Sequence, residues 1–178
     1  LMRTFNYSKI KEEKWDSEIL SLIAAIYKEA GKQEMYLKQR PEQLEKLVEI
    51  AKIQSTEASN AIEGIVTTNT RIKQLVTEKI TPKNRNEQEI AGYRDVLNII
   101  HDSFDAIPIT KNYILQLHKI LYSHMNNPIA GKTKTVQNYI SATYPDGHVE
   151  TLFTPLNPTD TTIALENICN EYNRTQAI

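Results

Sequence analysis

A single cysteine, Cys169, occurs in the 178 residues. One cysteine excludes an internal disulfide and any zinc site that needs several thiolates. The five glycines and seven prolines are thinly scattered, which leaves little room for an all-β fold with many turns. No apolar run approaches the roughly 20 residues that span a bilayer, and no secretory signal opens the chain. These absences favour a helical protein that does not enter a membrane, and we expect it to be cytoplasmic.

An excess of charge of either sign is also missing, because 21 Lys and Arg residues face 22 Asp and Glu residues for a net charge of −1. A chain this neutral has no bulk electrostatic attraction to nucleic acid or to an anionic membrane. Hydrophobic residues make up 40% and charged residues 24%, which are globular values and exclude intrinsic disorder. The length suits one ordinary domain or two small ones.

Apolar residues recur at three- and four-residue spacing along most of the chain, which is the periodicity of amphipathic helices. Gly31 is expected to end the first helix, Pro41 to open the second, and Thr110 to cap the fifth. The predicted helices cover Ser17–Ala30, Pro41–Gly64, Arg71–Thr77, Asn86–Phe104, Thr110–Met125 and a last helix that opens at Asn157-Pro158-Thr159. In the fourth helix, the residues expected to face inward are Ile90, Tyr93, Val96, Leu97, Ile100 and Phe104. We therefore expect a mainly α fold, a bundle of about seven helices.

The helical periodicity breaks between Thr133 and Thr154, where residues that favour strands flank the turn sequence Pro145-Asp146-Gly147. This pattern predicts one β-hairpin at about 134–154, with strands over Thr135–Ile140 and His148–Phe153 and a free outer edge. Because two strands alone are marginally stable, we expect the hairpin to pack on the helices. The residues expected to make this contact are Val136, Ile140 and Leu152.

Familiar catalytic patterns are scarce in this sequence. Gly131-Lys132-Thr133 lacks the upstream glycine and the preceding strand of a phosphate-binding loop. The four histidines are spread out and none belongs to an HExxH motif. We expect His118 to be a histidine at the edge of the core rather than a catalytic one, and Cys169 to be a small packing residue. The residues by themselves predict no catalytic group and no metal ligand in this chain.

Glu63 occupies an unfavourable electrostatic position. It lies in the last turn of the helix predicted over Pro41–Gly64, where a carboxylate faces the negative end of the helix dipole at a cost of about 0.3–1 kcal/mol. Ser59 stands four residues earlier and therefore on the same face. Helix physics leaves two interpretations open: Glu63 is a solvated side chain without a role, or a cation from elsewhere offsets its charge.

Ser59, Glu63 and Gly64 stand at the spacing [S/T]-x-x-x-E-[G/N], and this segment resembles the inhibitory helix of Fic (filamentation induced by cAMP) proteins. Further segments resemble the same family in the same order, over roughly Pro41 to Asn173. They are Asn86–Tyr93, similar to the start of the family's next helix; Ile109–Leu121, similar to its T-x-x-x-I-x-x-L-H-x-x-L helix; Ala130–Ile140, similar to the segment that leads into the family's hairpin, the flap; and Pro155 with the helix over Ile163–Tyr172.

The sequence departs from the family pattern in two places. Lys134 stands where arginine is usual, which keeps the charge but loses the bidentate guanidinium. The family's catalytic signature, H-P-F-x-[D/E]-G-N-G-[R/K], does not occur. In Fic proteins that loop follows the helix in which this chain ends, so we expect the protein to continue beyond Ile178 into the loop. Leu1 precedes Met2, and we expect Met2 to be the natural start.

The resemblance implies a protein adenylyltransferase that transfers AMP from ATP to a Tyr, Ser or Thr hydroxyl of a target protein. In complete family members the loop's histidine is the general base, an acidic residue of the loop holds Mg²⁺, and the glutamate matching Glu63 pairs with an arginine of the loop and blocks the productive position of ATP. The flap binds the target by strand addition. The residues that correspond to its docking strand are Lys134, Thr135, Val136, Gln137, Asn138, Tyr139 and Ile140.

This resemblance divides the chain into a helical extension over 1–40, the inhibitory-helix region over 41–80, and the first part of the Fic core over 81–178. Within these residues no catalytic residue and no metal site is expected, and ATP and Mg²⁺ belong to the complete protein. Two other classes remain open. One is a non-enzymatic helical module that binds a partner strand at the hairpin. The other is a nucleic-acid regulator, which the net charge of −1 disfavours.

Overall fold

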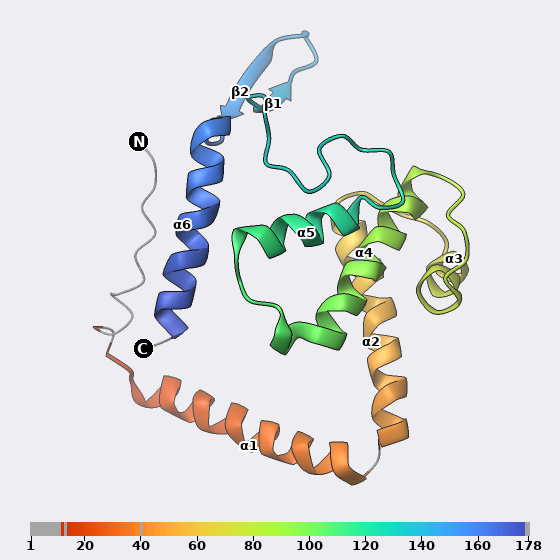
Figure 1. Ribbon diagram of the computed structural model, residues 1–178, viewed down its shortest axis with the longest axis vertical. Coiled ribbons are helices and arrows are strands. Elements are labelled where there is room, and N and C mark those ends of the chain that lie inside the picture. Colours follow the sequence, from red (N-terminus) through yellow and green to blue (C-terminus); the bar gives the residue numbers. More distant parts are fainter. Residues whose placement is uncertain (1–11, 13, 40, 177–178) are drawn as a thin grey trace. The chain divides into compact units, whose positions relative to one another are not determined.

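The computed structural model describes residues 12, 14–39 and 41–176. Over these residues the protein is mainly helical with one two-stranded antiparallel hairpin (Figure 1). The main elements are α1 (Ser17–Gln39), α2 (Pro41–Ile62), α3 (Asn69–Lys73), α4 (Arg85–Ser103), α5 (Lys111–Leu121), β1 (Ile140–Thr143), β2 (Val149–Phe153) and α6 (Pro158–Gln176). The described residues thus contain six α-helices rather than about seven. The expectations for Leu1, Met2 and Ile178 lie outside the described residues.

Two compact units make up the described part of the chain, the first ending at Leu97 and the second beginning at Asn98. The motif residues Ser59, Glu63 and Gly64 lie in the first unit, whereas the hairpin lies in the second. No helix among the described residues is both long enough and apolar enough to cross a bilayer.

Helix α1 continues through Gly31 to Gln39, so the predicted stop at Gly31 is wrong. A glycine in a helix interior costs about 1 kcal/mol relative to alanine, which neighbouring residues can offset. Lys32 pairs with Glu29 at 2.6 Å and Lys38 pairs with Glu34 at 3.1 Å, both at helical spacing. The residues after Gly31 are mostly good helix formers, so the helix continues past a residue that could have ended it.

Helix α2 begins at Pro41, as predicted, and packs against α3 and the π-helical turn η2 (Gln74–Glu78) that follows α3. The apolar spacing predicts the helix correctly but not its packing face, because Leu47, Val48 and Ile62 are exposed. The residues of α2 that are buried are polar, Thr56 and Asn60. The core of the first unit is completed by Ile72, Leu75, Val76, Ile90 and Ala91. The short helix predicted over Arg71–Thr77 therefore exists, as α3 and η2 together.

Helix α4 begins after Asn84, whose Oδ1 accepts a hydrogen bond from the backbone N–H of Glu87 at 3.0 Å. Ile90 is fully buried, as predicted. Ile100 and Phe104 were expected to face inward but are 38% and 71% exposed. The helix gives way to a 3₁₀ turn over Phe104–Ala106, so the helical spacing on which that expectation rested does not reach Phe104.

In the second unit, α5 and α6 are in contact, and both are capped as predicted. Thr110 Oγ1 accepts from the N–H of Tyr113 at 3.3 Å, and Asn157 Oδ1 accepts from the N–H of Asp160 at 2.8 Å. Lys111 on α5 pairs with Glu166 on α6 at 2.9 Å. Cys169 is buried on α6, which confirms that it is a packing residue.

The hairpin forms where the sequence predicts it, but its first strand is shorter and later than expected. β1 covers Ile140–Thr143 instead of Thr135–Ile140, while β2 covers Val149–Phe153. Val136, Ile140 and Leu152 are all exposed, so the expectation that they pack on the helices is wrong. All five residues of β2 are exposed and only Ala142 of β1 is half-buried, so the described residues cover little of the hairpin.

Candidate functional site

The end of α2 is a Schellman motif built by Glu63 and Gly64. The N–H of Ile65 donates to the carbonyl of Asn60 at 2.9 Å, and the N–H of Gly64 donates to the carbonyl of Ala61 at 3.0 Å. Gly64 has a φ of +73°, the left-handed conformation that this motif requires and that glycine adopts without a steric penalty. Gly64 thus ends the helix as predicted, and Glu63 is its C-terminal cap residue.

The carboxylate of Glu63 is exposed, and its side chain makes no hydrogen bond or ion pair with any residue that the structure describes. Its position beside the last carbonyls of α2 is the unfavourable one that the sequence predicts. A side chain so placed is open to a cation that approaches the end of the helix.

Ser59 is held by a residue of the neighbouring helix. The hydroxyl of Tyr93 on α4 donates to Ser59 Oγ at 3.0 Å. Asn60, the next residue, is buried, and its Nδ2 donates at 2.8 Å to the carbonyl of Thr56, which is also buried and lies one turn earlier. The last turns of α2 are therefore joined to α4 by a specific polar contact.

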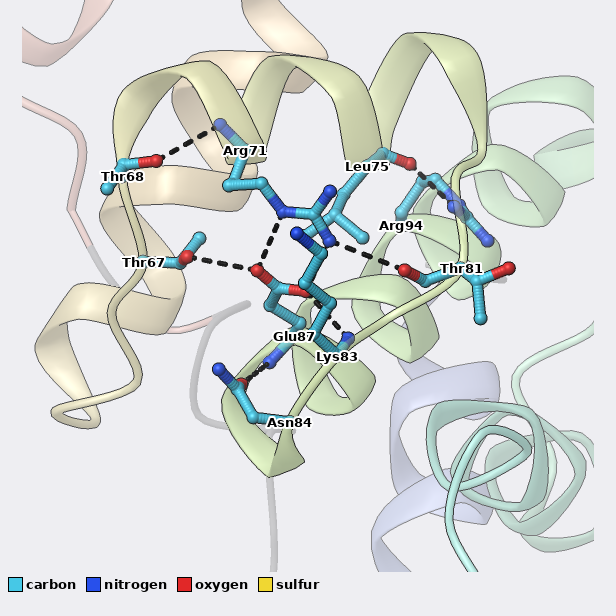
Figure 2. Close-up of polar contacts among 9 residues, drawn as sticks. All are labelled: Thr67, Thr68, Arg71, Leu75, Thr81, Lys83, Asn84, Glu87 and Arg94. Atoms are coloured by element: carbon cyan, nitrogen blue, oxygen red, sulfur yellow. Dashed lines mark hydrogen bonds and ion pairs between the residues drawn. The ribbon is translucent and has the colours of Figure 1, made fainter.

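The segment between α2 and α4 is organised around Glu87, which is only 3% exposed. Figure 2 shows its carboxylate among Thr67, Arg71 and Lys83; these four residues are called the Glu87 cluster below. Oε1 accepts from Arg71 Nε at 2.8 Å and from Thr67 Oγ1 at 3.3 Å. Oε2 accepts from Arg71 Nη2 and from the backbone N–H of Lys83 at 2.8 Å. The two oxygens together accept four hydrogen bonds.

These contacts keep Glu87 ionised. The hydrogen bonds from Arg71 lower the pKa of Glu87 to about 2, against a desolvation effect that raises it, and the N–H of Lys83 lowers it further. The same pairing raises the pKa of Arg71 above its usual value. Glu87 also stands in the first turn of α4, where the helix dipole favours a negative charge.

A second buried arginine binds the same segment further along the chain. Arg94 on α4 donates from Nη1 to the carbonyl of Leu75, inside the π-helical turn (Figure 2), and pairs with Asp95 at 2.6 Å. Asn86 Nδ2 donates to the carbonyl of Val66 at 3.1 Å. The sequence analysis missed these contacts. One signal was available, since Asn84 and Glu87 stand at the spacing of a helix capping box.

The residues that correspond to the docking strand of the flap lie mostly before β1. Of Lys134–Ile140 only Ile140 belongs to the strand. Lys134 Nζ donates to Asn138 Oδ1, and Gln137 Nε2 donates to the carbonyl of Pro155 at 3.0 Å, which ties this segment to the residues after β2.

The hairpin turn determines which backbone groups face outward. The N–H of Tyr144 donates to the carbonyl of His148 at 2.9 Å, and Gly147 has the left-handed φ of +84° that a three-residue hairpin loop uses. Because hydrogen-bonded and non-hydrogen-bonded pairs alternate in an antiparallel ladder, the N–H groups of Ser141 and Thr143 point away from β2. Among the described residues, no strand pairs with this edge of β1.

His118 behaves as a histidine at the edge of the core, as predicted. It is half-buried, its Nδ1 accepts from the N–H of Gly131 at 3.0 Å, and its ring meets that of Tyr122 edge-on at 5.0 Å. Gly131 has a φ of +73° in a loop and opens no helix, in keeping with the absence of a phosphate-binding loop there. In the described part of the chain, no group of three or more His, Cys, Asp or Glu side chains could hold a metal ion.

Comparison with known proteins found no matching family model and no matching curated protein.

Proposed function

We propose that this chain is the regulatory and target-docking portion of a Fic protein adenylyltransferase. The observation that carries the proposal is the sequence Ser59-x-x-x-Glu63-Gly64 at a helix end whose glutamate is exposed and whose glycine is left-handed. The order of the further resembling segments, up to Asn173, supports it. The complete protein transfers AMP from ATP to a hydroxyl of a target protein.

Glu63 is the inhibitory residue in this proposal. Its carboxylate faces the carbonyl end of α2 and has no cation beside it among the described residues, so an arginine of the catalytic loop would relieve an existing repulsion when it pairs with Glu63. The pairing withdraws that arginine from the phosphates of ATP and keeps the γ-phosphate out of its productive position. Removing the carboxylate therefore releases the enzyme.

The resemblance implies that an acidic residue of the catalytic loop holds Mg²⁺, and among the described residues no group of three or more His, Cys, Asp or Glu side chains could hold a metal ion. We accordingly assign the ATP phosphates and Mg²⁺ to the catalytic loop that Fic proteins carry after the region resembled here, and we assign no chemical step to this chain. Its contribution is to restrain the nucleotide site through Glu63 and to hold the target.

The free edge of β1 is the proposed docking site for the target. An extended segment that adds to this edge would bond to the outward N–H groups of Ser141 and Thr143, and such bonds select an extended conformation more than particular side chains. Lys134 and Asn138, which precede the strand, would contribute secondary contacts. The same edge also favours the alternative, a non-enzymatic module that binds a partner strand.

Labelling with radioactive ATP tests the proposal in the complete protein that contains this chain. With Mg²⁺ and ATP labelled at the α-phosphate, Glu63→Ala should raise self-labelling at least tenfold over the wild type, and Ser59→Ala should raise it less. Glu49→Ala is the matched control, since Glu49 is an exposed glutamate of the same helix.

Unchanged labelling in a folded Glu63→Ala protein would refute the inhibitory role. Absence of His-Pro-Phe and Gly-Asn-Gly from the residues that follow Ile178 in the complete protein would favour the non-enzymatic module.

A further inference from the structure

The inhibitory motif is bracketed by contacts to a single helix, α4. Tyr93 binds Ser59 four residues before Glu63, and Asn86 binds the carbonyl of Val66 three residues after it. Thr67, the next residue, donates to Glu87. Glu63 therefore lies on a short stretch of chain whose two ends are both held by α4.

Of the contacts on the two sides of the motif, the one after it, between Thr67 and Glu87, belongs to the stronger set of interactions. Glu87 is 3% exposed, and the side chain of its partner Arg71 is 19% exposed, so their ion pair is largely shielded from water. All four hydrogen bonds to the carboxylate come from the segment between α2 and α4, from Thr67 at its start to Lys83 near its end. The side chain of Glu87 thus bonds to residues near both ends of the segment that begins at Gly64.

A tyrosine hydroxyl bound to a serine hydroxyl is, by comparison, a neutral single hydrogen bond. Charge-assisted and bidentate bonds are roughly twice as strong as neutral ones. If the Glu87 contacts are lost, four donor groups on Thr67, Arg71 and Lys83 lose their acceptor. The hydrogen bonds from Tyr93 and Asn86, which still hold the described residues around the Schellman motif to α4, are both neutral. The turn that orients Glu63 is then free to open.

We propose that Glu87 is a positioning residue that fixes the direction of Glu63 and thereby sets the strength of autoinhibition. The proposal rests on the function proposed above and adds a second control point for it, outside the motif. Glu87 touches neither nucleotide nor target. It acts through Thr67, four residues after Glu63, and through the turn at Gly64, the residue next to Glu63.

Glu87→Gln is the primary variant, because it keeps the size of the side chain and removes its charge. Glu89→Gln is the matched control on the same helix, since Glu89 pairs with Arg85, whose side chain is 82% exposed. Thr67→Val is the second variant. It removes one of the four hydrogen bonds at nearly constant volume and leaves the ion pair in place, so it decides the question if Glu87→Gln does not fold.

The first readout is amide hydrogen exchange on this 178-residue chain. Glu87→Gln should speed exchange at the amides of Gly64 and Ile65 at least tenfold, with a smaller effect in Thr67→Val. The amides of α5, in the other unit, should be unchanged, as should all these amides in Glu89→Gln. Equal exchange at Gly64 and Ile65 in folded Glu87→Gln and wild-type protein would overturn the proposal.

The second readout is self-labelling of the complete protein with ATP labelled at the α-phosphate. Glu87→Gln should raise labelling at least threefold, approaching Glu63→Ala, whereas Glu89→Gln should not change it. A double variant should be no more active than Glu63→Ala alone, because both substitutions release the same restraint. A purely structural role for Glu87 would instead lower labelling in both backgrounds.

The outcomes distinguish a failure of this proposal from a failure of the proposed function on which it rests. If Glu63→Ala activates the protein while folded Glu87→Gln and Thr67→Val do not, the positioning role is wrong and the proposed function stands. If Glu63→Ala fails to activate, the proposed function is wrong and the role of Glu87 falls with it.

Discussion

Glu87 shows how a single side chain can satisfy two requirements of the fold at once. Its backbone N–H completes the cap of α4 by bonding to Asn84, while its carboxylate reaches back to the N–H of Lys83. In the usual capping box the glutamate bonds to the N-cap residue itself. Here it bonds one residue earlier and has two oxygens available for Arg71 and Thr67. The helix start and the loop closure therefore depend on the same residue.

The lowered pKa of Glu87 predicts an acid-sensitive contribution to stability. A carboxylate whose pKa falls from near 4.5 to about 2 on folding stabilises the protein fully above the higher value and loses this effect as the pH falls toward the lower one. The free energy of unfolding of the wild type should thus decrease more steeply between pH 5 and pH 2 than that of Glu87→Gln. Urea unfolding followed by circular dichroism at a series of pH values measures both slopes, and parallel curves would contradict the assignment.

The glycines at positions 64 and 31 should respond to alanine with opposite signs. Gly64 has a φ of +73°, and no atom lies within 4 Å of an added Cβ, so the cost of Gly64→Ala is backbone strain alone, about 1 kcal/mol. Gly31 lies inside α1 in open space, so Gly31→Ala should stabilise by about 0.5–1 kcal/mol. Urea unfolding measures the free energy of unfolding of both variants. If both substitutions stabilise the protein, the left-handed cap at Gly64 is refuted.

At the scale of elements, the sequence predicts the features that depend on contacts between residues close together in the chain. The ends marked by Gly64, Thr110 and Asn157 depend on bonds within a few residues, and these predictions are confirmed. Gly31 also predicts a helix end, but the residues that follow it are mostly good helix formers and the helix continues to Gln39. For the candidate site, the family resemblance identifies the motif, whereas the pairing of Glu87 with Arg71 spans 16 residues and no short spacing predicts it.

Proline substitution on the two edges of the hairpin tests which strand receives the target. Thr143→Pro removes an outward N–H from β1 and should lower modification of an added target about five- to tenfold, the effect of about one hydrogen bond. Thr151→Pro removes an outward N–H from the opposite edge, on β2, and should leave modification unchanged. Rates are measured in the complete protein with ATP in excess. If Thr151→Pro is the slower variant, the target docks on β2.

At the scale of the whole molecule, the residues proposed to restrain the nucleotide site and those proposed to bind the target lie in separate units. The proposed inhibitory motif belongs to the unit that ends at Leu97, and the hairpin belongs to the unit that begins at Asn98. Inhibition and target binding should therefore be separable by mutation, since no residue of the motif or of the Glu87 cluster belongs to the hairpin.

The 178 residues by themselves should not transfer AMP. They contain neither the His-Pro-Phe sequence nor the Gly-Asn-Gly sequence of the catalytic signature. Incubation with labelled ATP, Mg²⁺ and a cell lysate should leave no label above that of a sample without the protein. Robust labelling would show that the catalytic groups lie within these residues and would refute the assignment of catalysis to a further loop.

The four filled acceptor positions of Glu87 also determine its chemical reactivity. A carbodiimide must reach a carboxyl group whose oxygens are free to attack it, and Glu87 is shielded from solvent with both oxygens hydrogen-bonded. Glu63 lies four residues before Thr67, the first residue of the Glu87 cluster, and is exposed to the reagent. The two glutamates that matter most to this unit are therefore chemically distinguishable. A carboxyl-directed label can mark the residue proposed to inhibit while leaving intact the residue proposed to hold it in place.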